Sequence, residues 1–124
     1  MNIFKKIARA LTSQAARENK KYYTSAIIVA AGKSTRTSGN LPKQLVPIKG
    51  IPVVVRTMLA FEKCPLINEI IVVASHEQIK EYENFRRKYG IKKLSAVTVG
   101  GETRSDSVEA GFRAVSSKCE FVAI

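Results

Sequence analysis

The chain has 124 residues, which is enough for one domain with a single hydrophobic core and too few for two. Its 21 Lys and Arg against 10 Asp and Glu give a formal net charge of +11, which indicates an anionic partner such as a nucleotide, a phosphorylated metabolite, a nucleic acid or a membrane surface. Trp is absent, and no aromatic residues alternate with a basic run to form a stacking platform. We therefore expect no nucleic-acid partner.

The first 24 residues are expected to form a basic amphipathic extension, followed by a domain at residues 25–124. The extension carries six basic side chains and one acidic side chain. Between residues 3 and 17, apolar side chains such as Ile3, Ile7 and Leu11 recur at helical spacing. The apolar stretch is too interrupted to cross a membrane. Such a helix can contact an anionic membrane through residues 1–20, direct a protein to an organelle, or pack on its own domain.

A short apolar run at residues 26–31 predicts a buried strand that leads into a basic loop of small residues at 32–44. Gly32 can adopt backbone angles closed to other residues, and the loop is rich in hydroxyl groups and cations. This composition suits a polyphosphate, although the spacing matches neither a Walker A loop nor a dinucleotide-binding glycine motif. A surface loop with ordinary solvated lysines is the alternative.

Helices and strands alternate along the rest of the chain. After an extended piece at 45–48 and Pro52, the apolar patterns predict helices at 53–64, 76–89 and 103–116 and strands at 70–74, 96–99 and 120–124. Val108, Phe112 and Val115 are expected to face inward from the last helix. This order implies an α/β fold with a doubly wound, mostly parallel sheet and helices on both faces. The loops at 32–44 and 100–107 would then meet at the carboxyl edge of the sheet, where ligands bind.

The second of these loops reads Gly100-Gly101-Glu102-Thr103-Arg104-Ser105-Asp106-Ser107-Val108. It leaves a strand through two glycines and enters a helix whose positive end favours an anion or a polar base edge. Acidic residues in a first helical turn also cap the helix, so Glu102 and Asp106 have a purely structural interpretation as well. Taken alone, the loop is explained by capping.

Together the two loops resemble a known family. The first resembles the sugar- and alcohol-phosphate nucleotidyltransferases through Ala30-Ala31-Gly32, Ser34-Thr35-Arg36 and Pro42-Lys43-Gln44. Combined with the second loop, the pattern resembles 2-C-methyl-D-erythritol 4-phosphate cytidylyltransferase over about residues 25–124. That family has a Rossmann-like fold and transfers CMP from CTP to a sugar-alcohol phosphate, releases pyrophosphate and uses Mg2+. Ribitol 5-phosphate cytidylyltransferase is a related alternative, whose second loop usually lacks the Asp-Ser-Val of residues 106–108.

The resemblance implies a role for each matching residue. Arg36 and Lys43 would act in catalysis by holding the triphosphate and stabilising charge on the attacked phosphate. The residues expected to line the nucleotide are Ala30, Ala31, Gly32, Gly101, Glu102 and Ser107. Arg104 and Asp106 would brace the second loop. Ser34 stands where the family often has a second glycine.

In the family, the strand that begins here at Phe121 continues into a His-Asp-x-Ala-Arg-Pro motif whose aspartate serves the metal. The resemblance therefore implies a truncated, N-terminal, CTP-binding part of the enzyme, inactive alone, with its Mg2+ ligand beyond Ile124 and none assigned within this chain. The intact family forms homodimers. Cys64 and Cys119 stand in apolar settings without metal-ligand spacing, as expected for a reducing cytoplasm. His76, the sole histidine, is expected to be an exposed residue near a helix start. A non-catalytic nucleotide- or membrane-associated module is the alternative from another class.

Overall fold

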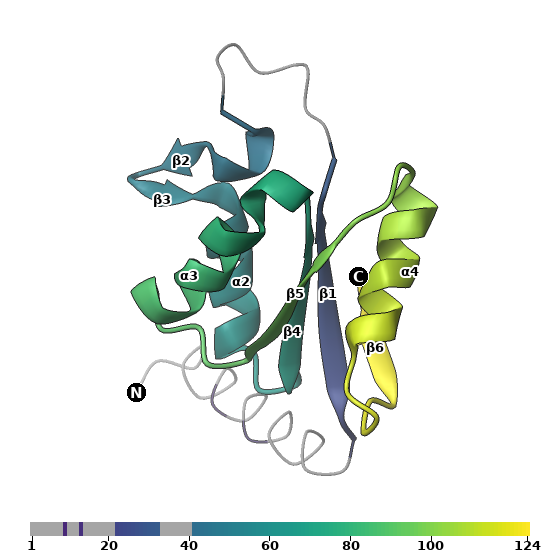
Figure 1. The fold of residues 1–124 in the computed structure, drawn as a ribbon. Coiled ribbons are helices and arrows are strands. Elements are labelled where there is room, and N and C mark those ends of the chain that lie inside the picture. Colours follow the sequence, from purple (N-terminus) through teal and green to yellow (C-terminus); the bar gives the residue numbers. More distant parts are fainter. Residues whose placement is uncertain (1–8, 10–12, 14–21, 33–40) are drawn as a thin grey trace.

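A computed structural model describes residues 22–32 and 41–124, together with Arg9 and Ser13 (Figure 1). Most of the proposed extension, and Arg36, lie outside these residues. The elements, in chain order, are β1 (Thr24–Ala30), η1 (Lys43–Leu45), β2 (Pro47–Ile48), β3 (Ile51–Pro52), α2 (Val53–Lys63), β4 (Glu69–Ala74), η2 (His76–Gln78), α3 (Ile79–Lys88), β5 (Leu94–Val99), α4 (Arg104–Ala114) and β6 (Phe121–Ala123). No helix in the described part of the chain has the length and apolar character needed to span a membrane.

Four parallel strands form the main sheet in the order β5-β4-β1-β6, which confirms the predicted α/β fold. β1 is central and pairs Ala26 with Ile70 of β4 on one side and with Ala123 of β6 on the other. Every residue of β4 is buried, as its continuous apolar run predicts for a strand covered on both faces. All four carboxyl ends therefore lie at one edge of the sheet.

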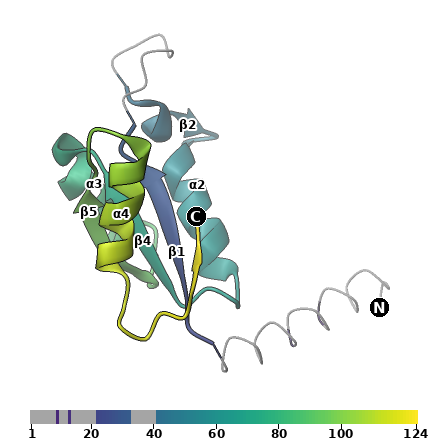
Figure 2. The same ribbon diagram turned by 90° about the vertical axis from the view of Figure 1, so that its right-hand side faces the viewer.

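Helices cover both faces of this sheet (Figures 1 and 2). Because side chains alternate along a strand, Ala26 and Val72 face α2 and α3, while Ile27 and Val73 face α4. Met58 of α2 and Tyr82 of α3 are fully buried in the larger of the two clusters. The alternation of strands and helices in the sequence thus leads to three layers, with α2 and α3 on one face of the sheet and α4 on the other. The hydrophobic core is thick on the face covered by α2 and α3 and thin on the face covered by α4.

The segment before α2 differs from its prediction. Instead of one extended piece at 45–48, the chain forms the 3-10 helix η1, whose Leu45 is buried, and then the hairpin of β2 and β3. The hairpin turns through Lys49 at φ 50° and Gly50 at φ 78°, two consecutive left-handed residues that match the right-handed twist of the strands. Pro52 then caps α2, close to the start predicted for that helix.

The inward face predicted for the last helix is wrong at Phe112, whereas Val115, at the end of α4, packs against the sheet as predicted. Phe112 is 47% exposed, whereas Ser107 and Gly111 are the buried residues of this helix. Ala110 and Ala114 also pack against the sheet. The apolar pattern predicted that the larger side chains face the sheet. However, α4 approaches the sheet so closely along most of its length that only small residues fit between them. The thin core on this face is the result.

The helix predicted at 76–89 is a 3-10 turn, η2, followed by α3, which ends before Gly90 at φ 67° as expected of a glycine stop. Tyr82 faces inward from α3, and Phe85 is buried beside it. The two rings stack with their centroids 5.7 Å apart. Burial, with a smaller contribution from Glu81, raises the pKa of the Tyr82 hydroxyl to about 12.

Replacing Tyr82 with Phe is expected to leave stability unchanged or to raise it slightly at neutral pH. The Tyr82 hydroxyl is buried and has no hydrogen-bond partner among the described residues, so its removal relieves a desolvation cost of about 1 kcal/mol. The raised pKa means that the folded state favours the neutral hydroxyl. The parent chain should therefore lose stability as pH rises from 10 to 12, and the Phe variant should lose less. Urea unfolding at pH 7 and pH 11 measures both effects, and a Phe variant less stable at pH 7 would contradict the first.

Candidate functional site

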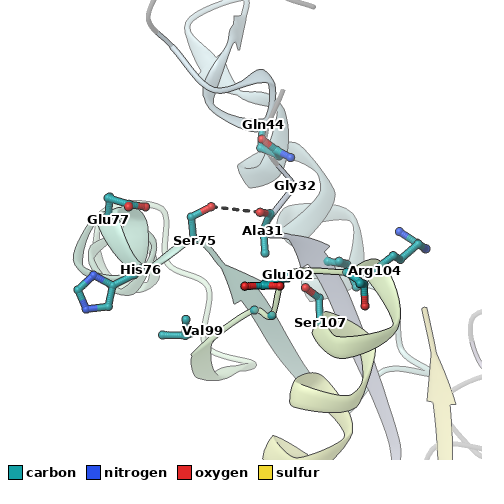
Figure 3. A pocket seen from close by; sticks show the side chains of 14 residues that line it. Ala31, Gly32, Gln44, Ser75, His76, Glu77, Val99, Glu102, Arg104 and Ser107 are labelled. Carbon is teal, nitrogen blue, oxygen red and sulfur yellow. Dashed lines mark hydrogen bonds between the residues drawn. The ribbon is translucent and has the colours of Figure 1, made fainter. Parts of the chain in front are cut away.

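An open pocket of about 920 Å³ lies at the carboxyl edge of the sheet. Three chain segments surround it, each following a strand, as the topology of a parallel sheet requires. Ala31 and Gly32 follow β1, Ser75 to Glu77 follow β4, and Val99 to Arg104 lead from β5 into α4. Figure 3 shows the segment after β4 on one side of the pocket, with Ser107 and Arg104 on the other.

The two glycines after β5 let the backbone pass close to its neighbours. A methyl group on Gly100 would lie 2.4 Å from Ala31 Cβ and 2.7 Å from Ser107 Oγ. A methyl group on Gly101 would lie 2.3 Å from Asp106 Cβ. The Gly100 N–H donates to the Ala74 carbonyl at 2.9 Å, which holds this crossing in place at the end of β4. Glycine is therefore required at both positions to bring β1, β5 and α4 together around the pocket.

Thr103 and Asp106 cap the start of α4 reciprocally. The Asp106 N–H donates to Thr103 Oγ1, and the Thr103 N–H donates to Asp106 Oδ2, both at 3.1 Å. This capping box fixes the loop conformation, as proposed for Asp106 from sequence. It also holds Ser107, only 3% exposed, where it lines the pocket. The capping interpretation and the binding interpretation of this loop are therefore compatible.

The first loop is described at its two ends. Ala31 and Gly32 line the pocket, and Ala30 is buried just before them in β1. The Ser75 hydroxyl donates to the Ala31 carbonyl at 3.2 Å and so links the ends of β1 and β4. Five of the six residues proposed to line the nucleotide therefore lie around one pocket, and the sixth, Ala30, immediately precedes Ala31 in the chain.

Lys43 stands on η1 and is exposed, one residue before Gln44, which lines the pocket. Lys43 itself is not among the lining residues. The buried Leu45 fixes this short helix to the core, and the Leu45 N–H donates to the Pro42 carbonyl at 2.9 Å. The flexible Lys43 side chain thus starts from a fixed position beside the pocket.

Sequence reasoning missed the third wall. Ser75, His76 and Glu77 line the pocket, and His76 is also exposed near a helix start as expected. A signal for this wall was present, because every strand of a parallel sheet delivers its following residues to the same edge. The segment after residues 70–74 could have been placed there with the other two.

A parallel α/β sheet whose carboxyl edge carries glycine-containing loops around an open pocket is an arrangement typical of nucleotide-binding α/β proteins. Residues 24–124 match the family IspD: 2-C-methyl-D-erythritol 4-phosphate cytidylyltransferase. An enzyme of this name from Clostridium botulinum is 41% identical over 100 residues, which span 81% of this chain and 44% of the relative. One from Alkaliphilus oremlandii is 40% identical over 102 residues, or 82% of this chain and 43% of the relative. The chain belongs to the 2-C-methyl-D-erythritol 4-phosphate cytidylyltransferase family.

Solved structures agree on the fold. A 4-diphosphocytidyl-2C-methyl-D-erythritol synthase from Anaerococcus prevotii superposes with a TM-score of 0.66 at 24% identity, covering 83% of this chain and 42% of that one. HddC from Yersinia pseudotuberculosis superposes with a TM-score of 0.54 at 16% identity, covering 77% of this chain and 44% of its own. The chain thus spans a little under half the length of the proteins that it matches.

Proposed function

We propose that this chain supplies the CTP-binding part of an enzyme that transfers CMP from CTP to 2-C-methyl-D-erythritol 4-phosphate with release of pyrophosphate. Family membership over residues 24–124 supports the reaction class. The observation that carries the proposal is the pocket itself, which brings Ala31, Gly32, Gly101, Glu102 and Ser107 together from two separate loops. These are the residues that the family pattern assigns to the nucleotide.

The charges around the pocket favour one orientation of CTP. Glu102, Glu77 and Arg104 all line the pocket, so its described lining carries two carboxylates and one arginine cation. A carboxylate accepts hydrogen bonds from the cytosine amino group and from the ribose hydroxyls, whereas it repels a triphosphate because both are negatively charged. The triphosphate would therefore lie towards the loop after β1, near Lys43 and the segment that contains Lys33 and Arg36.

In the transfer, an oxygen of the acceptor phosphate attacks the α-phosphorus of CTP, and the bond to the bridging oxygen of pyrophosphate breaks. Negative charge moves onto the leaving pyrophosphate. Arg36 and Lys43 would hold these oxygens and stabilise the charge, because positioning and neutralisation are the protein's main tasks in phosphoryl-type transfer.

Mg2+ remains part of the proposal, and no ligand for it is assigned within this chain. Within residues 22–32 and 41–124, no three His, Cys, Asp or Glu side chains gather as a metal-ligand group. Asp106, the sole aspartate of the sequence, already accepts a hydrogen bond from the Thr103 N–H. No step of the reaction is therefore assigned to a metal held by these residues.

The proposal extends to the surroundings of the enzyme. A homodimer and a cytoplasmic location follow the family, and Cys64 and Cys119 are free thiols, which is consistent with a reducing compartment. Contact of residues 1–20 with a membrane is the weaker alternative. Co-sedimentation with anionic vesicles, with and without residues 1–20, tests it directly.

Calorimetric titration with nucleotides tests the proposed function. We expect the chain to bind CTP at least about tenfold more tightly than UTP, because the two bases differ in the amino group that Glu102 and the loop backbone would recognise. Glu102→Gln should reduce this preference, whereas Glu83→Gln, on the exposed face of α3, should not. A folded chain that binds neither nucleotide, or binds both equally, would refute the proposal. Pyrophosphate release with both substrates, measured in parallel, tests the expectation that the chain alone is inactive.

A further inference from the structure

The close packing of α4 on the sheet depends on one residue outside the two loops. Gly111 is buried in the second half of α4, one helical turn after Ser107, so the two residues share the face that meets the sheet. A methyl group on Gly111 would lie 2.5 Å from Ile27 Cγ2 and 3.2 Å from Val73 Cγ2. Carbon atoms in ordinary contact are about 3.5–4.0 Å apart. Any other residue at this position would therefore push α4 away from β1 and β4.

The neighbours of Gly111 have no room to yield. Ile27 is 2% exposed in β1, and Val73 is fully buried in β4, so both stand in the most constrained part of the sheet. β1 is paired on both sides, with β4 and with β6. An added methyl group would consequently move the helix rather than the strands.

One turn earlier along α4, beside the pocket, the helix lies equally close to the ends of β1 and β5. Ser107 Oγ and Ala31 Cβ both lie within 2.7 Å of the place that a methyl group on Gly100 would occupy. A helix moves as a rigid body over one turn, so a displacement at Gly111 reaches Ser107 and the capped loop before it. We propose that Gly111 is a positioning residue for the nucleotide pocket, because its missing side chain sets how closely α4 and the loop at residues 100–103 approach the end of β1.

The size of the effect follows from the distances. Relieving a 2.5 Å contact needs a movement of about 1 Å, and a misplacement of that size at a binding site can cost roughly a hundredfold in rate. We expect Gly111→Ala to weaken CTP binding by about tenfold or more. This expectation rests on the proposed function, so the experiment also needs a measurement that requires no nucleotide.

Amide NMR spectra of the ligand-free chain supply that measurement. In Gly111→Ala, the amide signals of Gly100, Gly101 and Ser107 should shift, and the Gly100 N–H, which donates to the Ala74 carbonyl, should exchange faster with solvent. Gly90→Ala is the matched control. Gly90 has φ 67° and no neighbour within 4 Å of an added methyl group, so this variant is strained but lies at the far end of α3. Its thermal midpoint should fall while the pocket amides and CTP affinity remain unchanged.

A second variant separates positioning from loss of stability. Ile27→Ala removes both atoms of Ile27 that an added methyl group would meet, Cγ2 and Cδ1. The double variant Ile27→Ala/Gly111→Ala should therefore restore the pocket amide signals and CTP affinity towards the parent values, although its thermal midpoint stays low because the core has lost volume. It also provides the comparison if Gly111→Ala alone does not fold.

Each outcome decides the proposal. Unchanged pocket amides in a folded Gly111→Ala, or a double variant whose pocket signals move further from the parent spectrum, would overturn it. If the parent chain fails to bind CTP, the proposed function fails, while the amide signals still decide the role of Gly111.

Discussion

Replacing Glu69 with Ala is expected to lower the free energy of unfolding by about 3 kcal/mol or more, among the largest losses available at a single position. Glu69 begins β4 and is only 5% exposed. Its Oε1 accepts hydrogen bonds from Ser25 Oγ at 2.5 Å and from the Ser116 N–H at 2.7 Å, and its Oε2 accepts one from Ser95 Oγ at 3.0 Å. One carboxyl group therefore joins β1, β4, β5 and the segment after α4 at the amino edge of the sheet.

The loss is large because the donors stay behind. Ser25 is fully buried, so without Glu69 its hydroxyl has neither this acceptor nor water, and the Ser116 N–H loses its acceptor as well. Each buried donor left unpaired costs about 1–3 kcal/mol, and the removed side chain leaves a cavity. Glu69→Gln should cost less, since the amide oxygen can still accept from two donors.

Urea unfolding measures the loss, with Glu83→Ala on the exposed surface of α3 as the control, expected to change stability by about half a kcal/mol or less. CTP affinity, measured where the Ala variant remains folded, should match the parent because Glu69 stands at the edge opposite the pocket. A Glu69→Ala variant as stable as the Glu83→Ala control would show that the hydrogen-bond network contributes little.

The order of the elements and the class of sheet follow from the sequence, since both depend on periodic apolar patterns that a single chain displays. The apolar run of β4 and the glycine that follows α3 are local signals of this kind. The two loops were recognised because glycine and hydroxyl residues at fixed spacing follow strands. Their meeting at one pocket is a consequence of parallel topology, which the alternation of elements already implies.

Features that depend on distances between elements could not be predicted. Phe112 looked like a core residue because it is large and apolar, yet the gap between α4 and the sheet admits only small residues, so Gly111 is buried and Phe112 is exposed. Glu69 would normally be expected at the surface, and its burial depends on three donors from distant parts of the chain. Such positions can be identified only once the packing is known.

Removing the positive charge of Lys43 or Arg36 is expected to have the largest effect on function. If both side chains clamp the triphosphate, replacing either with Ala removes a charge-assisted contact worth a few kcal/mol, which is roughly a hundredfold or more in the rate of the complete enzyme. Binding of CTP to the present chain should weaken by about tenfold or more for the same reason. Because Lys43 is exposed on η1, its loss should change stability by only about half a kcal/mol or less.

Lys80→Ala is the matched control for both variants, because Lys80 is an exposed cation in the first turn of α3 and does not line the pocket. It removes the same charge and should leave CTP affinity within about twofold of the parent, which separates a local clamp from general attraction by the net charge of +11. Lys43→Arg should also be impaired if the site requires a compact ammonium group, since the guanidinium group is larger and planar. The measurements are CTP affinity and the thermal midpoint for this chain, and kcat/KM for CTP in an enzyme that contains it. Full affinity in both Lys43→Ala and Arg36→Ala would show that the first loop is an ordinary solvated surface.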